Sequence, residues 1–334
     1  MFKIIAKYIY FVLNLIFISS VIFSQDVDFS QFFANKLYLN PAFAGSTEAA
    51  GFSFVTRTEW YSTLNTFDDI SIGIDQYVKQ LKGGVGALFL YDKPGTGLNK
   101  ISLDLQYSYG IKLTNTFNIN FGIQGTTLFK SISQSKYIFP DMIDPINGPV
   151  IPTNEPLGET LTKIYFDASA GLVGTLKNTY FGFAVHHIPE PNESFSAAQI
   201  KQLVKRKYTF HFGTEIKIYK NGLVKEKYSI SPNFLYQYQY SHQLNYGLYF
   251  TYKEITFGSW FRHNIGKNNI FNYDAMIFMI GYSKPEYDLA YSYDFKIPKI
   301  NVGYLNIHVH EVTFLYKFQY NPKKKISAIK CPKF

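Results

Sequence analysis

The sequence predicts an all-β protein, a single transmembrane antiparallel β-barrel of about 14 strands of the outer-membrane type. Long runs alternate apolar and polar residues with a period of two, as in strands with one apolar face. Aromatic residues make up 19% of the chain, yet the mean hydropathy is only -0.08, as expected when apolar outer stripes are balanced by a polar interior. After the N-terminal region no segment has the roughly twenty consecutive apolar residues of a spanning helix.

The alternation is clearest over residues 100–129. Every odd position from Ile101 to Leu113 is apolar, and the even positions between them are polar or glycine. Residues 114–116 interrupt this run, and the odd apolar stripe resumes at Phe117, which predicts a tight antiparallel hairpin. A soluble strand averages about five or six residues, whereas a strand that crosses a bilayer needs roughly nine to eleven. The length of this hairpin therefore favours a membrane strand.

Similar segments follow one another to the end of the chain. An even number of strands puts both ends of a barrel wall on one side. Tyrosines crowd at the strand ends, which is typical of an interfacial aromatic girdle. The faces opposite the apolar stripes carry charged residues that a lumen can hold. The predicted strands lie near 52–61, 68–78, 83–92, 100–113, 116–129, 164–176, 180–188, 207–218, 227–240, 243–252, 255–263, 274–283, 287–296 and 308–318.

The connections alternate in length, as in outer-membrane barrels with short periplasmic turns and longer external loops. Two connections break this pattern, because 219–226 is too long for a turn and 241–242 is too short for a loop. The longest external segment, within 130–163, is rich in proline and predicts an ordered or plug-like loop. A short helix is predicted near 196–207.

The two ends of the chain carry their own signals. Residues 1–24 combine two lysines, an apolar stretch and a small residue before Gln25, which predicts a secretory signal peptide. Residues 25–51 form an apolar lead-in segment, expected to pack in one barrel mouth or the lumen, with partner binding as the alternative. The barrel itself would span 52–318, and 319–334 would be a periplasmic tail. We therefore expect the outer membrane as the location, with both termini periplasmic and the long loops extracellular.

Composition argues against several other classes of protein. The net charge of +9 falls to about +7 without the two signal lysines and is spread over turns and tail, so it does not indicate a nucleic-acid partner. Cys331 is the single cysteine, which excludes a disulfide within the chain and leaves a free thiol or intermolecular pairing. The basic run 323–325 predicts a solvated tail, or attraction to acidic headgroups or an acidic periplasmic partner.

No catalytic, cofactor-binding or metal-binding residue is predicted. His186 and His187 are adjacent on a strand and should point to opposite faces, so they should not share a metal. His308 and His310 share a face, but Glu311 points the other way and no third ligand is in reach. The chain has no GxSxG turn, and the glycines near Gly83 lack the lysine and helix of a phosphate loop.

Seven stretches in order resemble the PorP/SprF family of type IX secretion system outer-membrane proteins. Residues 130–163 match least, and TRTEW carries Glu59 where the family has glutamine. The matching stretches are DFSQFFANKLYLNPAFAG at 28–45, TRTEW at 56–60, GGVGALFLYDKPGTG at 83–97, VHHIPEPNESF at 185–195, YSYDF at 291–295, HEVTFLYKF at 310–318 and IKCPKF at 329–334.

The resemblance implies a non-enzymatic barrel without a cofactor, associated with secretion or surface attachment of cargo such as gliding adhesins. Its implied partners are outer-membrane lipid, a cargo protein's C-terminal domain and periplasmic secretion or motility components, with no nucleic acid. The alternatives are a barrel-architecture role for most motif residues, a passive channel or hydrophobic-ligand transporter, and a rim enzyme. Candidate contact residues are Asn40, Pro41, Gly45, Arg57, Trp60, His186, His187, Pro191, Asn192, His310, Glu311, Cys331 and Pro332.

Overall fold

The computed structural model describes most of the barrel wall and the segment that precedes it. The predicted signal peptide and C-terminal tail lie outside the described residues. The described residues are 26–46, 49–59, 66–133, 137, 139–144, 148–149, 160–195, 201–220, 226–265, 271–297 and 308–318. The wall strands are β1 (Gly51–Glu59), β2 (Phe67–Val78), β3 (Gly83–Lys93), β4 (Leu98–Lys112), β5 (Phe117–Ile132), β8 (Leu161–Leu176), β9 (Thr179–His186), β10 (Lys207–Thr214), β11 (Ile216–Lys220), β12 (Glu226–Tyr238), β13 (His242–Tyr252), β14 (Ile255–Ile265), β15 (Phe271–Ser283), β16 (Tyr287–Lys296) and β17 (His308–Lys317).

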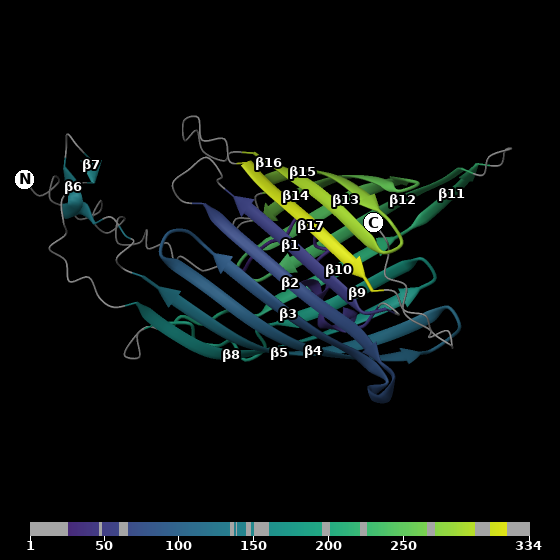
Figure 1. Cartoon of the computed structure of the whole chain (residues 1–334), viewed down its shortest axis with the longest axis horizontal. Helices are drawn as coiled ribbons and strands as arrows, with labels where there is room; N and C mark the ends of the chain where they lie inside the picture. Colours follow the sequence, from purple (N-terminus) through teal and green to yellow (C-terminus); the bar gives the residue numbers. More distant parts are fainter. Residues whose placement is uncertain are drawn as a thin grey trace, which may run out of the picture.

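These strands close into a 14-stranded antiparallel β-barrel (Figure 1), which confirms the predicted fold. β1 pairs with β2 on one side and with β17 on the other, so the first and last strands meet. β10 and β11 are separated only by Glu215 and both pair with β12, so they form one bent strand of the wall. Pairing of β10 with β9 and β12 completes the ring.

The apolar face of the wall points outward. On β4, Leu103 and Leu105 are 50% and 63% exposed, while the alternate residues Asp104 and Gln106 are buried in the lumen. Phe166 on β8 is 72% exposed. A water-soluble sandwich would bury these apolar stripes, whereas a barrel in a bilayer presents them to lipid. The period-two pattern therefore has the orientation that a membrane barrel requires.

The connections divide the barrel into two ends. The turn end carries the short connections 79–82, 113–116, 177–178, 253–254 and 284–286. The loop end carries the connections 60–66, 94–97, 133–160, 187–206, 239–241, 266–270 and 297–307.

Of the two connections that broke the length pattern, one has a simple explanation. β11 continues to Lys220 and β12 begins at Glu226, so we predicted the end of the first strand two residues too early and the start of the second one residue too late. The short connection at 239–241 remains a genuine exception at the loop end.

The described helices are short: α2 (Lys36–Leu39), η1 (Pro41–Phe43), η2 (Lys79–Leu81) and η4 (Pro140–Met142). Within the described ranges, no helix has both the length and the apolar character needed to cross a bilayer. The helix predicted near 196–207 is wrong over 201–207, because Leu203 forms a β-bridge with Asn192 and Lys207 begins β10.

The long segment between β5 and β8 does not enter the lumen where it is described. It contains two short strands that pair with each other, β6 (Ile143–Asp144) and β7 (Gly148–Pro149). Figure 1 shows this pair beyond the loop end of the wall. The predicted plug-like role of 130–163 is therefore wrong for these residues, and a different segment fills the lumen.

Candidate functional site in the barrel lumen

Residues 26–46, here called the plug, lie inside the barrel and run along its length. At the loop end, Asp26 contacts His187. At the turn end, the backbone N–H of Gly45 donates to Asp75. Most plug residues are buried and none is fully exposed, and polar Gln31 and Asn35 are only 1% exposed. The chain then joins β1 at the turn end, so the first described residue and the start of the wall lie at opposite ends of the barrel.

The plug has its own local structure around Asn40. The Asn40 side chain accepts a hydrogen bond of 2.9 Å from the N–H of Ala42, which caps η1. Pro41 occupies the first helical position, where its missing N–H costs nothing. Asn40 has extended backbone angles, as expected of a residue before proline. Two sequence signals, Asn-Pro and a side-chain cap, thus shape the turn of the plug at η1.

A buried group of charges, here called the clamp, holds the N-terminal half of the plug. Glu311 accepts hydrogen bonds from the backbone N–H groups of Ser30 (2.7 Å) and Gln31 (2.8 Å). The Ser30 hydroxyl donates to Asp294 at 2.6 Å. The clamp consists of Ser30, Gln31, Arg57, Arg262, Asp294 and Glu311.

Two arginines neutralise the clamp carboxylates. Arg57 lies 3.2 Å from Asp294 and 3.3 Å from Glu311, and Arg262 lies 3.2 Å from Asp294. All four side chains are at most 2% exposed. Buried charges are tolerated only when they are paired and hydrogen-bonded. Because the plug completes this hydrogen-bonding set through Ser30, its removal would leave buried polar groups without partners.

An aromatic layer packs beside the clamp. The ring of Phe32 meets that of Trp260 edge-on at 5.0 Å between centroids. Phe33 meets Tyr180 at 5.6 Å and Tyr249 at 6.2 Å in similar T-shaped contacts. These rings lie in one buried apolar cluster that joins the plug to several wall strands. Burial of these rings adds hydrophobic stabilisation, which is non-directional, to the directional hydrogen bonds and ion pairs of the clamp.

Glycines in the wall let the plug backbone come close. A Cβ atom on Gly122 would lie 2.2 Å from the backbone nitrogen of Ala42. On Gly84 it would lie 2.0 Å from the backbone oxygen of Ala44. No side chain fits at such distances, so these positions require glycine.

A charged triad fixes the loop-end tip of the plug. His187 contacts Asp26 at 2.9 Å through Nε2 and Asp167 of the wall through Nδ1. Burial lowers the pKa of His187, but the charges of Asp26 and Asp167 raise it more, to about 10. For Asp26 the directions are reversed. Burial raises the pKa of its carboxyl group, but the charges of His187 and Lys207 lower it well below its usual range. The imidazolium therefore bridges two carboxylates at neutral pH.

This triad predicts a pH-dependent hold on the plug. When the plug tip is released, His187 has its ordinary pKa of about 6.5. The stabilisation of the docked plug tip by His187 is therefore complete below pH 6.5 and is lost as the pH rises towards 10. We expect open-channel conductance of the protein in planar bilayers to rise about tenfold over this window. His187→Gln should show the higher conductance at pH 7 already and no further rise. An unchanged pH profile in that variant would contradict the role of His187.

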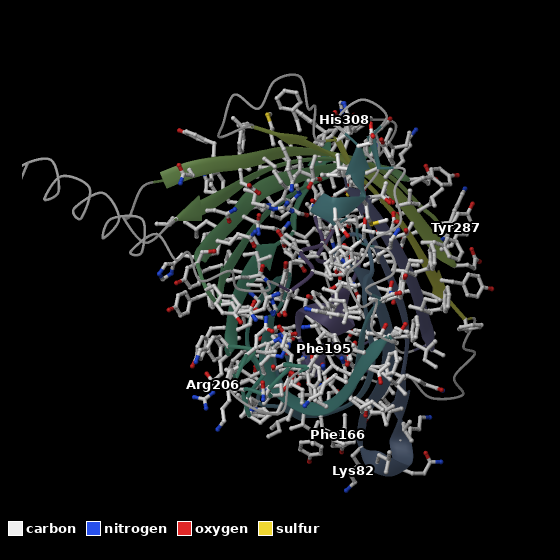
Figure 2. The ribbon with its side chains drawn as sticks, turned by 90° about the vertical axis from the view of Figure 1, so that its left-hand side faces the viewer. Lys82, Phe166, Phe195, Arg206, Tyr287 and His308 are labelled. Atoms are coloured by element: carbon white, nitrogen blue, oxygen red, sulfur yellow. The ribbon has the colours of Figure 1, made fainter. Side chains whose placement is uncertain are left out.

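A cavity of about 90 Å³ lies between the plug and the wall near the triad. His187, Glu193 and Val204, from the described parts of the connection 187–206, line it at the loop end. Glu193 of this connection, 3% exposed, lies 3.6 Å from Lys100 and 3.1 Å from Lys130. Figure 2 shows Phe195 within the outline of the barrel, and Lys130 lies 5.2 Å from its ring centre. The lining residues include Asp26, Tyr38, Asp92, Lys100, Asp104, Asp167, His186, His187, Glu193, Val204 and Lys207.

The candidate residues from the sequence fall into three groups. Most lie at the plug or its sockets: Asn40, Pro41, Gly45, Arg57, His186, His187 and Glu311. Pro191 and Asn192 shape the connection 187–206, through Val204 N–H and Gln202 N–H respectively. His310 lies on the outer face and pairs with the hydroxyl of Tyr291 at 2.8 Å. Trp60, Cys331 and Pro332 lie outside the described residues.

One geometric expectation about these residues is wrong. His186 and His187 both line the cavity, because His187 lies past the end of β9 with a left-handed φ of 56°. The alternation of faces therefore stops at His186. In the part of the chain that the structure describes, no group of three His, Cys, Asp or Glu side chains is placed to hold a metal ion.

Sequence reasoning missed Ser30, Gln31 and Arg262 as part of the site. The chain has only three arginines, Arg57, Arg206 and Arg262. Two of them sit on strands at positions that face the lumen and belong to the clamp. An arginine at a lumen-facing position of a membrane strand is the sequence feature that would have indicated a buried charged site.

The model of the family described as "Type IX secretion system membrane protein PorP/SprF" matches residues 21–316. The chain belongs to this family. The plug, the clamp and the cavity are thus features of a PorP/SprF protein, a membrane protein of type IX secretion with an outer-membrane-type β-barrel. Most of the motifs through which the sequence resembled the family contribute to the plug or to the strands around it.

Several solved barrels are similar in outline to this PorP/SprF protein. The Pseudomonas putida toluene transporter TodX is 9% identical, with a TM-score of 0.47 and coverage of 84% of this chain and 93% of that one. The Ralstonia pickettii toluene transporter TbuX is 10% identical, with a TM-score of 0.46 and coverage of 85% and 93%. A Pseudomonas aeruginosa FadL homologue is 13% identical, with a TM-score of 0.39 and coverage of 84% and 93%. A search of curated proteins gave no match.

Proposed function

We propose that this protein is a non-enzymatic barrel of the outer membrane that binds or anchors a secreted cargo protein at the cell surface. The loop end faces outward and holds the cargo's C-terminal domain. The turn end faces the periplasm, where the C-terminal tail contacts secretion or motility components. The observation that carries this proposal is the filled lumen. A plug fixed by the clamp and the triad leaves a cavity of about 90 Å³, which no polypeptide can traverse.

The connection 187–206 is the best candidate for cargo contact. It is anchored from below, because Glu193 and Val204 are buried under the barrel rim. Its outer side presents the exposed cations Lys201, Lys205 and Arg206. A rigidly held basic surface favours a partner with an acidic patch. Gliding adhesins are among the cargo that the family resemblance suggests.

The test compares surface display of cargo in cells that carry variants of this protein. We expect Lys201→Glu, Lys205→Glu and Arg206→Glu together to reduce display at least severalfold, because three charges are reversed at the contact. The matched control reverses Lys79 and Lys82, exposed cations at the turn end. Barrel abundance in the outer membrane is measured in parallel. Normal display with the triple variant, and also after deletion of the gene, would contradict the proposal.

A second candidate is a channel or transporter for small hydrophobic ligands. The cavity beside the plug favours it, because it offers an internal space near the loop end. However, an engineered cavity of about 150 Å³ is what accommodates benzene, and this cavity is smaller and lined by charged groups. Uptake of a small aromatic compound by proteoliposomes would support transport. Absence of uptake together with loss of cargo display on deletion would favour anchoring.

A further inference from the structure

The lumen cavity carries more acidic than basic groups. Its lining contains five carboxylates, from Asp26, Asp92, Asp104, Asp167 and Glu193. The cations in the same lining are Lys100, Lys207 and His187. Charge of one sign in a confined space attracts a ligand of the opposite sign.

The lining cations are already engaged with particular carboxylates. His187 bridges Asp26 and Asp167. Lys207 lies 3.8 Å from Asp26, and its ammonium group sits 5.3 Å from the centre of the Tyr38 ring. Lys100 lies 3.6 Å from Glu193. These contacts pair the cations with Asp26, Asp167 and Glu193.

These contacts leave over two of the five carboxylates, Asp92 and Asp104. Asp92 shares a hydrogen bond with the carboxyl group of Asp69. Among the described residues, Asp104 on β4 has no such carboxyl partner. Its side chain lines the cavity, and the residue is only 4% exposed. Hydroxyl groups of Ser102 and Thr126 hydrogen-bond to it, and both are neutral. Its Oδ1 atom accepts no hydrogen bond from any described residue, and no described side chain forms an ion pair with it. A buried carboxylate oxygen of this kind is costly unless a donor reaches it.

We propose that the cavity binds a small primary ammonium group, which donates hydrogen bonds to Asp104. The ammonium supplies a positive charge and N–H donors to the Oδ1 atom of Asp104, which accepts no hydrogen bond from a described residue. The space of about 90 Å³ corresponds to roughly three water molecules. It therefore suits an ammonium with one to a few carbon atoms and excludes bulky cations. Such a group can be a free amine or the end of a lysine side chain on a partner peptide.

The test measures binding to the full chain, purified in detergent, by isothermal titration calorimetry. Methylammonium is compared with tetramethylammonium, which has the same charge but no N–H donor and a larger volume. We expect binding of methylammonium that is at least about tenfold tighter, as lost charged hydrogen bonds would predict. Equal affinity for the two cations, or no binding of methylammonium, would overturn the proposal.

Variants then locate the site. Asp104→Asn keeps the size of the side chain but removes the charge, and should weaken methylammonium binding about tenfold or more. The matched control is Asp68→Asn, which removes a half-exposed carboxylate outside the cavity and should leave affinity unchanged. Heat-modifiable gel mobility verifies that each barrel is folded. Unchanged affinity in folded Asp104→Asn would also overturn the proposal.

A second arm distinguishes the two sources of the ammonium. A short peptide with one lysine is compared with the same peptide acetylated on that lysine, both with blocked N-termini. Binding of the unmodified peptide, lost on acetylation and in Asp104→Asn, identifies a partner's side chain as the ligand. Binding of methylammonium alone identifies a free amine. This proposal is independent of cargo display, since ammonium binding can fail while the basic connection 187–206 still anchors cargo.

Discussion

Arg57→Met is expected to release the plug while leaving the barrel wall closed. The substitution removes the cation that lies against both Asp294 and Glu311, and these carboxylates stay buried. Breaking a buried ion pair on one side costs about 3–5 kcal/mol. Methionine fills much of the same space, so the loss is mainly electrostatic. We expect Ala34→Cys, at a buried plug position, to become reactive to a soluble maleimide at least a hundredfold faster.

The experiment uses a Cys331→Ser background, so that the reporter is the only thiol. The control is Arg206→Met, which makes the same chemical change in a side chain that is 49% exposed. Surface ion pairs contribute little, so the control should leave labelling unchanged. If Arg57→Met also leaves the labelling rate of Ala34→Cys unchanged in a folded barrel, the clamp does not hold the plug.

Gly122→Val is expected to displace the middle of the plug. Its Cβ would lie 2.2 Å from the nitrogen of Ala42 and 2.4 Å from the carbonyl carbon of Pro41. Backbone atoms cannot yield as flexible side chains do, so η1 must move away from β5. Overpacking costs typically about 1–3 kcal/mol when a core adapts, and here the contacts are with backbone. We expect a large increase in single-channel conductance in planar bilayers.

Gly125→Val provides the matched control on the same strand. A Cβ at Gly125 meets no heavy atom within 4 Å. Gly125 lies on the outer face of β5, whereas Gly122 lies on the lumen face. Valine at position 125 would therefore face lipid. This variant should keep the conductance of the unmodified protein. Equal conductance in Gly122→Val and Gly125→Val would show that the plug does not occupy its socket in the membrane.

The wall was largely predictable from the sequence because one physical rule governs it. Lipid outside and a polar lumen inside impose a period of two on every strand, and nothing else in the chain competes with that pattern. The predicted strand 287–296 matches β16 residue for residue. The predicted face of a side chain was wrong where a strand ends. At His187, just past β9, the backbone is left-handed and the side chain turns into the cavity.

The plug was not predictable in the same way. Its segment has no sustained periodicity, and its conformation depends on partners far along the chain. Ser30 and Gln31 bind Glu311, which lies 281 and 280 residues later. Propensity and spacing carry no information about such pairs. Only after the ring closes does the register bring Arg57 opposite Glu311 between β1 and β17. Apolar composition indicated burial of the segment, but not the residues that hold it.

The seam between β1 and β17 has a consequence for biogenesis. Glu311, which holds the start of the plug, belongs to the last strand to be synthesised, and that strand pairs with the first. The N-terminal segment therefore has no finished docking place until the C-terminal strand is inserted. Sealing of the pore is consequently a late event in assembly, and a chain truncated before β17 would yield a leaky, incomplete cylinder.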